Sequence, residues 1–297
     1  MATPTSGVVQ RGRRLLRGPV SAARLEAARD TGWYSWLARI GLVAKGVSFG
    51  IVAVLAIKVA LGDGGKATSR EGALQTIAEH WFGKVLLILL AIGFAAYAIW
   101  RFVQAIAENE ADEDATGTAK EWGKRAGYVG RGLIYAALTY GAIKILAGSG
   151  AESQTAKAHK TTAAVLDWPA GRWIVGIVGV CIVGAGLWNA YRAVTRSFED
   201  KWRTSQMSET ERTWGGRAGV AGHLARAVVF GLVGVFVAKA AIDYDPQHAI
   251  GIDGALQKLG EASYGPWLLG VTAAGLLGYG LYCLVDARYR DVSTNTA

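Results

Sequence analysis

The chain has 297 residues and contains 40 glycines but only 5 prolines, which excludes collagen-like chains and proline/glycine-rich disordered chains. Its two cysteines, Cys181 and Cys283, both lie in apolar segments, so the sequence has neither a disulfide framework nor a Cys-x-x-Cys metal motif. The formal net charge of +9 would suit a nucleic-acid-binding protein, but the positions of the basic residues favour a different explanation.

Six segments are long and apolar enough to cross a bilayer as helices, which requires roughly 20 mainly apolar residues each. In chain order they cover residues 37–61, 84–104, 127–147, 172–194, 220–242 and 266–286. No proline lies in the middle of a segment, so we expect mostly continuous helices. The sequence therefore predicts an all-α polytopic membrane protein.

Short amphipathic stretches join the two segments of each pair, and we expect them to form interfacial helices. They cover residues 69–80, 160–167 and 251–262. The predicted organisation is a basic cytoplasmic segment (1–35), repeat 1 (36–107), an acidic cytoplasmic linker (108–122), repeat 2 (123–197), a charged cytoplasmic linker (198–215), repeat 3 (216–290) and a tail (291–297).

Of the 32 lysines and arginines, 22 lie before the first segment, in the connections that follow the even-numbered segments or at the adjoining helix ends, and 7 lie on the opposite side. The positive-inside rule then predicts a multi-pass protein of the cytoplasmic (plasma) membrane with both termini inside. This distribution explains the net charge without nucleic acid. We expect the lipid bilayer to be the partner, with anionic headgroups on the cytoplasmic side; the sequence identifies no protein partner.

An internal repeat gives the strongest signal in the sequence. In the second segment of each repeat, a glycine is followed by aromatic residues four and seven positions later, which places all three on one helix face. The three copies are Gly93-Tyr97-Trp100, Gly184-Trp188-Tyr191 and Gly275-Tyr279-Tyr282. Because each repeat has two spans, the copies share one orientation, and we expect a pseudo-three-fold bundle about the membrane normal.

The first segment of each repeat has its own pattern: a basic residue, a small residue, and a second small residue four positions later. The copies are Lys45-Gly46-Gly50, Arg131-Gly132-Ala136 and Arg226-Ala227-Gly231. Small residues four apart let transmembrane helices approach closely. We therefore predict that these small residues, together with Gly93, Gly184 and Gly275, serve helix packing.

The triple two-span repeat, the glycine–aromatic second helix and the closing Asp286-Ala287-Arg288-Tyr289-Arg290 resemble a bacterial membrane family catalogued as domain of unknown function 1206. The resemblance covers roughly residues 36–290. It implies a location in the cytoplasmic membrane and no established activity.

Three lysines, Lys58, Lys144 and Lys239, lie thirteen residues after the basic residue of each copy, or about 20 Å along the helix. One hypothesis is a ring of three ammonium groups on the central axis that binds an anion or a small solute. The alternative, which we favour, is that each lysine extends along lipid to the outer interface.

The inner basic residues Lys45, Arg131 and Arg226 are interpreted as topology anchors. The histidines and cysteines have no metal-ligand spacing, and no nucleophile lies beside a base, so we expect no metal, no cofactor and no enzymatic activity. The function predicted from the sequence is a non-enzymatic membrane scaffold or regulator. The alternative is a small channel or carrier that uses the lysine ring.

Overall fold

The computed structural model describes residues 32–62, 73–75, 78, 82–107, 119–150 and 152–291, and these are mostly helical. The helices are α3 (Gly32–Ala60), α5 (Gly83–Ala107), α6 (Ala119–Leu146), α7 (Gln154–Leu166), α8 (Gly171–Thr195), α9 (Glu209–Asp243), α10 (Ile252–Glu261) and α11 (Gly265–Tyr289), with short 3-10 turns η1 (Glu199–Lys201), η2 (Thr204–Gln206) and η3 (Pro246–His248). The described residues contain no strand beyond an isolated bridge between Trp202 and Arg290.

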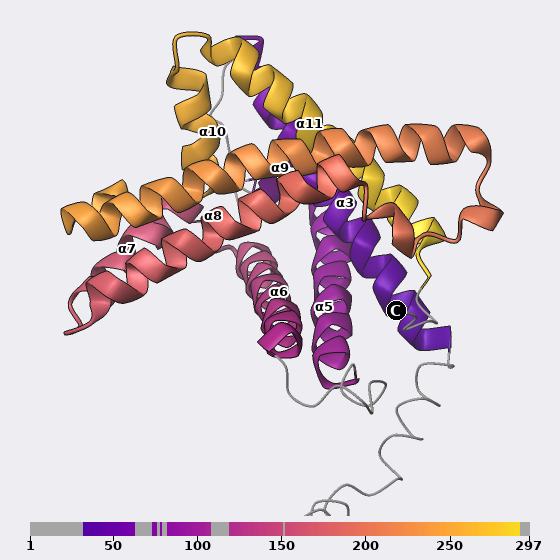
Figure 1. Cartoon of the computed structure of the whole chain (residues 1–297), viewed down its shortest axis with the longest axis horizontal. Helices are drawn as coiled ribbons and strands as arrows, with labels where there is room; N and C mark the ends of the chain where they lie inside the picture. Colours follow the sequence, from indigo (N-terminus) through magenta and orange to yellow (C-terminus); the bar gives the residue numbers. More distant parts are fainter. Residues whose placement is uncertain are drawn as a thin grey trace, which may run out of the picture.

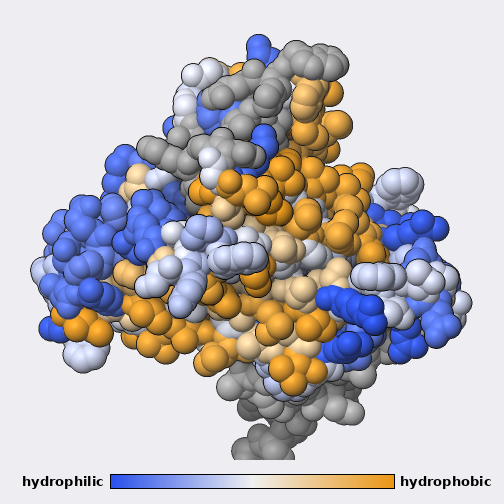
Figure 2. All heavy atoms as spheres, turned by 90° about the horizontal axis from the view of Figure 1, so that it is seen from above, coloured by the Kyte–Doolittle hydropathy of each residue, from blue (hydrophilic) through white to orange (hydrophobic). Residues whose placement is uncertain are grey.

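Six of these helices, α3, α5, α6, α8, α9 and α11, are long and apolar enough to cross a membrane. They form three consecutive two-helix repeats, so the predicted fold class and the six spans are confirmed. Figure 2 shows apolar side chains gathered across the middle of one face, with hydrophilic side chains at its two flanks. This is the distribution expected of a multi-pass membrane protein.

The connections contain more helix than the sequence analysis predicted. Helix α9 begins inside the predicted charged linker because Ser208 and Glu211 form a capping box, in which each side chain binds the other residue's backbone N–H. Helix α6 likewise begins inside the predicted acidic linker. Helix α10 matches the interfacial helix predicted at 251–262 within one residue, and α7 contains most of the one predicted at 160–167. Residues 1–31, 108–118, 292–297 and most of 69–80 lie outside the described residues.

The spans pack in three pairs, and each pair joins neighbouring repeats. The second helix of one repeat lies along the first helix of the next: α5 on α6, α8 on α9, and α11 on α3. In Figure 1, α8 and α9 run side by side across the view, α5 and α6 run steeply away from them, and α3 and α11 cross diagonally. Because the last helix also packs on the first, the same second-helix-on-first-helix contact is made three times, as expected of a pseudo-three-fold arrangement.

Packing within the repeats is less regular. In repeats 1 and 3 the two spans touch at backbone distance: a β-carbon added to Gly41 would lie 2.6 Å from Cβ of Tyr97, and one added to Gly222 would lie 2.5 Å from Cα of Tyr279. In repeat 2, α6 and α8 show no comparable packing among the described residues. The equivalent Gly127 would meet only the side chain of Arg131, 4.0 Å away.

The predicted packing glycines of the second helices also differ between repeat 2 and the other two repeats. A β-carbon on Gly93 would lie 2.3 Å from Cβ of Ala44, and one on Gly275 would lie 2.6 Å from Cβ of Ala225, whereas Gly184 has open space. Between repeats, the β position of Gly46 faces the carbonyl of Gly280 and that of Gly132 faces the ring of Phe102. The β positions of Gly50 and Gly231 are open, but the backbones of both face a small residue on the neighbouring helix. Ala136 packs partly buried against the core formed by residues of α3, α5 and α6. The carbonyl of Ala227 lies 3.1 Å from the β position of Gly186.

Candidate functional site

The three outer lysines lie on the surface of the molecule. Lys58 and Lys144 are in the last turns of α3 and α6, and all three lysine residues are exposed. The ammonium group of Lys239 is 4.0 Å from the carboxylate of Asp243, and that of Lys144 lies 5.9 Å from the centre of the Tyr140 ring on its own helix. These contacts are local, and they fit lysines that extend to an interface better than a shared ring.

The inner basic residues are the ones that converge on the middle of the bundle. The Nζ atom of Lys45 lies 5.5 Å from the ring centre of Tyr97 and 5.0 Å from that of Tyr279. Both tyrosines are buried, and they come from the second helices of repeats 1 and 3. A topology anchor does not require such an enclosed position, so the structure adds a contact role that the sequence analysis did not foresee for Lys45.

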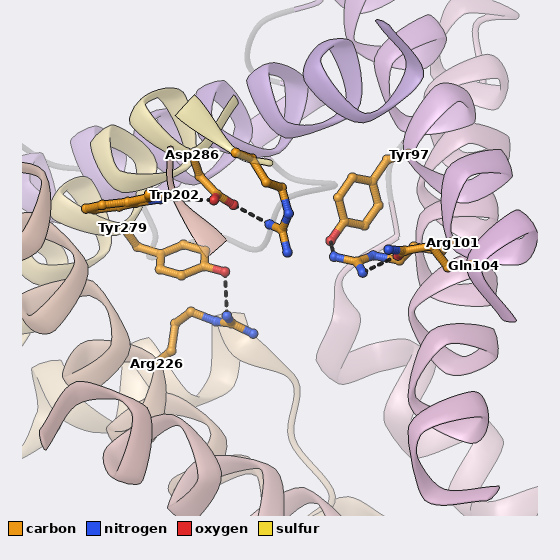
Figure 3. Close-up of polar contacts among 8 residues, drawn as sticks. Tyr97, Arg101, Gln104, Trp202, Arg226, Tyr279 and Asp286 are labelled. Carbon is orange, nitrogen blue, oxygen red and sulfur yellow. Dashed lines mark hydrogen bonds and ion pairs between the residues drawn. The ribbon is translucent and has the colours of Figure 1, made fainter. Parts of the chain in front are cut away.

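Two arginines bind the hydroxyl groups of the same tyrosines. Arg226 donates to the Tyr279 hydroxyl at 2.6 Å, and Arg101 donates to the Tyr97 hydroxyl at 2.6 Å and to Gln104 Oε1 at 2.6 Å. Figure 3 shows the two pairs, Arg226 of α9 with Tyr279 of α11, and Arg101 with Tyr97, both of α5. Each guanidinium also lies over the ring that it binds, 4.5 Å from Tyr279 and 4.8 Å from Tyr97, which is a favourable cation–π geometry.

Arg131, the equivalent residue of repeat 2, differs from the other two. Its side chain lies over Tyr128 of its own helix, 5.8 Å from the ring centre, and its charge interacts with those of Arg101 and Arg226. Its counterpart aromatic residue on α8, Trp188, is 56% exposed, whereas Tyr97 and Tyr279 are 1% and 2% exposed. We call Lys45, Arg101, Arg131 and Arg226 the central basic cluster.

The carboxylate near this cluster, that of Asp286, already has partners. Asp286 is buried and pairs with Arg290 and with the indole N–H of Trp202, 3.1 Å away (Figure 3). Burial disfavours the charged form of Arg290, but the Asp286 carboxylate outweighs this effect, and the pKa of Arg290 is raised above its usual value. Within the described part of the chain, no residue of the cluster forms an ion pair with a carboxylate.

The cluster also retains unused donors. The Nε atoms of Arg101 and Arg226 are buried without a hydrogen-bond partner among the described residues, and the whole Arg101 residue is only 5% exposed. Cations removed from water and left without a counter-ion are unfavourable, so the arrangement is chemically suited to bind an anion. The described residues hold no group of three or more His, Cys, Asp or Glu side chains that could bind a metal ion.

Arg101 was not predicted as a site residue, although the sequence contains a signal for it. An arginine that follows the uncharged stretch Val85–Trp100 within a membrane span is unusual enough to suggest a function, and Arg192 holds the equivalent position in repeat 2. Asp286 belongs to the segment 286–290 that resembles the family, but its hydrogen-bond partner Trp202 is 84 residues away in the sequence. No local pattern could have indicated that contact.

Comparisons with known proteins bear on the repeat and not on the chemistry. Residues 40–108, 126–196 and 221–290 each match the family described as Domain of Unknown Function (DUF1206). A Bacillus subtilis protein described as "Uncharacterized protein YxxB" is 30% identical over 264 residues, which cover 88% of this chain and 93% of that protein. No solved structure matches the chain.

Proposed function

The chain belongs to the DUF1206 family, and on that premise we propose that it is a non-enzymatic scaffold or regulatory protein of the plasma membrane with both termini in the cytoplasm. The observation that supports this best is the close packing around the bundle axis. Buried tyrosine rings enclose the ammonium group of Lys45, and in repeats 1 and 3 the helices meet where a β-carbon would not fit. Such a bundle is suited to hold its connecting segments in place.

The connection between α8 and α9 is the surface best placed to hold a partner protein. It is anchored by Trp202 on Asp286 and by a bond from the Arg203 N–H to the Tyr289 carbonyl, 2.8 Å long. Several of its charged residues, such as Asp200, are exposed.

Proximity labelling from a C-terminal fusion tests the scaffold function. We expect a set of labelled cytoplasmic proteins that is lost when the exposed charged residues of 198–215 are replaced by serine while Phe198 and Trp202 are kept. If the labelled set is the same as that of an unrelated six-span protein, the scaffold function is wrong. A second C-terminal fusion tests the topology. It carries a reporter that is active only in the periplasm, and we expect the reporter to stay inactive.

A second function, anion permeation, is favoured by the central basic cluster and not by the outer lysines. Flux of a permeant anion from proteoliposomes distinguishes a route through the central basic cluster from a route through the outer lysines. Flux that is lost in Arg226→Gln but kept in the triple Lys58, Lys144 and Lys239→Ala variant would favour a route through the cluster. Flux equal to that of empty liposomes would exclude permeation and leave the scaffold function.

A further inference from the structure

The second repeat has an open side, and the faces that line it are the ones that repeats 1 and 3 bury. On α8 this face carries Cys181, Gly184, Trp188 and Tyr191, which are all exposed. The equivalent residues are buried in repeat 1 (Leu90, Gly93, Tyr97 and Trp100) and in repeat 3 (Thr272, Gly275, Tyr279 and Tyr282). The rings of Trp188 and Tyr191 stack on each other, with centres 5.3 Å apart.

The equivalent face of α6 is also uncovered at Gly130. In repeats 1 and 3, the residue before the basic residue is Ala44 or Ala225, and it meets the glycine of the second helix. In repeat 2 this position is Gly130, and a β-carbon there would meet nothing within 4 Å. The open side therefore has a small residue on each wall, Gly130 and Gly184, with Arg131 next to the first.

The charges at the open side of repeat 2 indicate which kind of ligand can bind there. Arg131 is exposed, and its guanidinium carbon and that of Arg101 lie 5.8 and 5.6 Å from the centre of the same Tyr128 ring. No carboxylate of the described residues pairs with either arginine. A phosphate group accepts hydrogen bonds from arginine in a bidentate geometry. The complementary ligand is therefore an anion with a phosphate or a similar group.

The surroundings of the open side select a lipid over a soluble anion. Both walls are membrane spans, and exposed apolar side chains flank the site, including Leu133 and Ile134 on α6 and Val180 and Leu187 on α8. A ligand that enters between two spans comes from the bilayer. Hydrocarbon chains would cover these side chains, while a headgroup phosphate reaches the arginines.

We propose that an anionic phospholipid binds in the open side of repeat 2, with its phosphate on the exposed guanidinium of Arg131, next to the charge of Arg101, and its acyl chains against Gly184 and Trp188. This site goes beyond the scaffold function and does not depend on it. The lipid occupies the position that a second-helix aromatic residue fills in the other two repeats. In the proposed orientation, the cluster faces the cytoplasmic leaflet.

Native mass spectrometry of the purified full-length protein tests the site. The protein in detergent is titrated with phosphatidylglycerol or with phosphatidylcholine of the same acyl chains. We expect phosphatidylglycerol to be preferred, and Arg131→Gln to weaken its binding about tenfold, the size of one charge-assisted contact. Lys144→Gln is the matched control, because it removes an exposed cation from the same helix, and it should bind as the wild type does. Equal binding of the two lipids, or of Arg131→Gln and wild type, overturns the proposal.

A second variant tests the open side without altering a charge. Gly184→Leu fills the space between the walls and should weaken phosphatidylglycerol binding, whereas Ala185→Leu adds a similar volume on an adjacent exposed face and should not. Equal binding by these two variants places the lipid elsewhere and overturns the proposal. Complete displacement by inorganic phosphate would assign the site to a soluble anion, and a lipid-independent dimer lost in Gly184→Leu would assign it to a second copy; both results also overturn the proposal.

Discussion

Repeats 1 and 3 are closed and repeat 2 is open, although all three carry the same glycine–aromatic pattern. The difference arises outside the pattern. Helix α7 of repeat 2 docks on repeat 3, where Asp253 on α10 accepts hydrogen bonds from the Thr155 hydroxyl and N–H at 2.7 and 3.1 Å. Arg172 at the start of α8 donates to the carbonyl of Ala241 on α9 at 2.9 Å.

The buried side chains show the same division. One hydrophobic core joins α3, α5 and α6, and another joins α7, α8 and α9. No described core cluster contains buried residues from both α6 and α8. Repeat 2 is thus divided between its neighbours, which shows that a repeat in sequence need not be a packing unit.

The largest expected contrast is in the reactivity of the two native cysteines, since Cys181 is exposed on the open side and Cys283 is buried. In detergent, N-ethylmaleimide should label Cys181 almost completely before it labels Cys283. Intact mass, with a Cys181→Ser control, measures the two reactions. Similar labelling rates for both cysteines would mean that repeats 2 and 3 are equally open.

The next contrast compares equivalent glycines. Gly222→Ala places a methyl group against the backbone of Tyr279 and should destabilise the protein by about 1–3 kcal/mol through overpacking. Gly127→Ala has open space and should be neutral or stabilising by up to about 1 kcal/mol. Thermal unfolding in detergent, followed by tryptophan fluorescence, measures both. A loss at Gly127 as large as the loss at Gly222 would show that α6 and α8 pack closely after all.

The contact between α7 and α10 can be broken directly. Asp253→Ala removes the carboxylate that accepts from the Thr155 hydroxyl and N–H and should reduce stability by about 1–3 kcal/mol. Thr155→Val and the double variant complete a double-mutant cycle, which isolates the coupling between the Thr155 hydroxyl and the Asp253 carboxylate. Strictly additive effects would mean that this contact does not hold repeat 2 onto repeat 3.

The smallest expected effects come from the aromatic position shared by the repeats. Tyr279→Phe leaves the Arg226 guanidinium without its acceptor and should destabilise by about 1–2 kcal/mol. Trp188→Phe changes an exposed ring and should stay within about 0.5 kcal/mol. The same unfolding assay compares the two, and the reverse order of effects would place the buried site in repeat 2.

Spans, repeats and the interfacial helix α10 could be predicted because each is recorded in local periodicity. The start of α9 was also readable from Ser208 and Glu211 but was assigned to a linker. The candidate anion site was predicted at Lys58, Lys144 and Lys239 and not at Lys45 and Arg226, and the reason is physical. Spacing along a helix locates a residue in the membrane but not the helices that surround it. The open side could not be predicted, because it depends on contacts such as Thr155–Asp253, 98 residues apart.

The packing of α11 on α3 has a consequence for how the chain is made. Gly46 and the carbonyl of Gly280 meet so closely that a β-carbon on Gly46 would lie 2.8 Å from that oxygen, yet the ribosome produces the two glycines far apart in time. At a translation rate of about 5–20 residues per second, α11 is synthesised roughly 10–50 s after α3. During that interval its small-residue face is open to other helices in the membrane. Assembly of the bundle is therefore completed only after synthesis of the last span, and premature pairing of α3 with another helix is a route to misassembly.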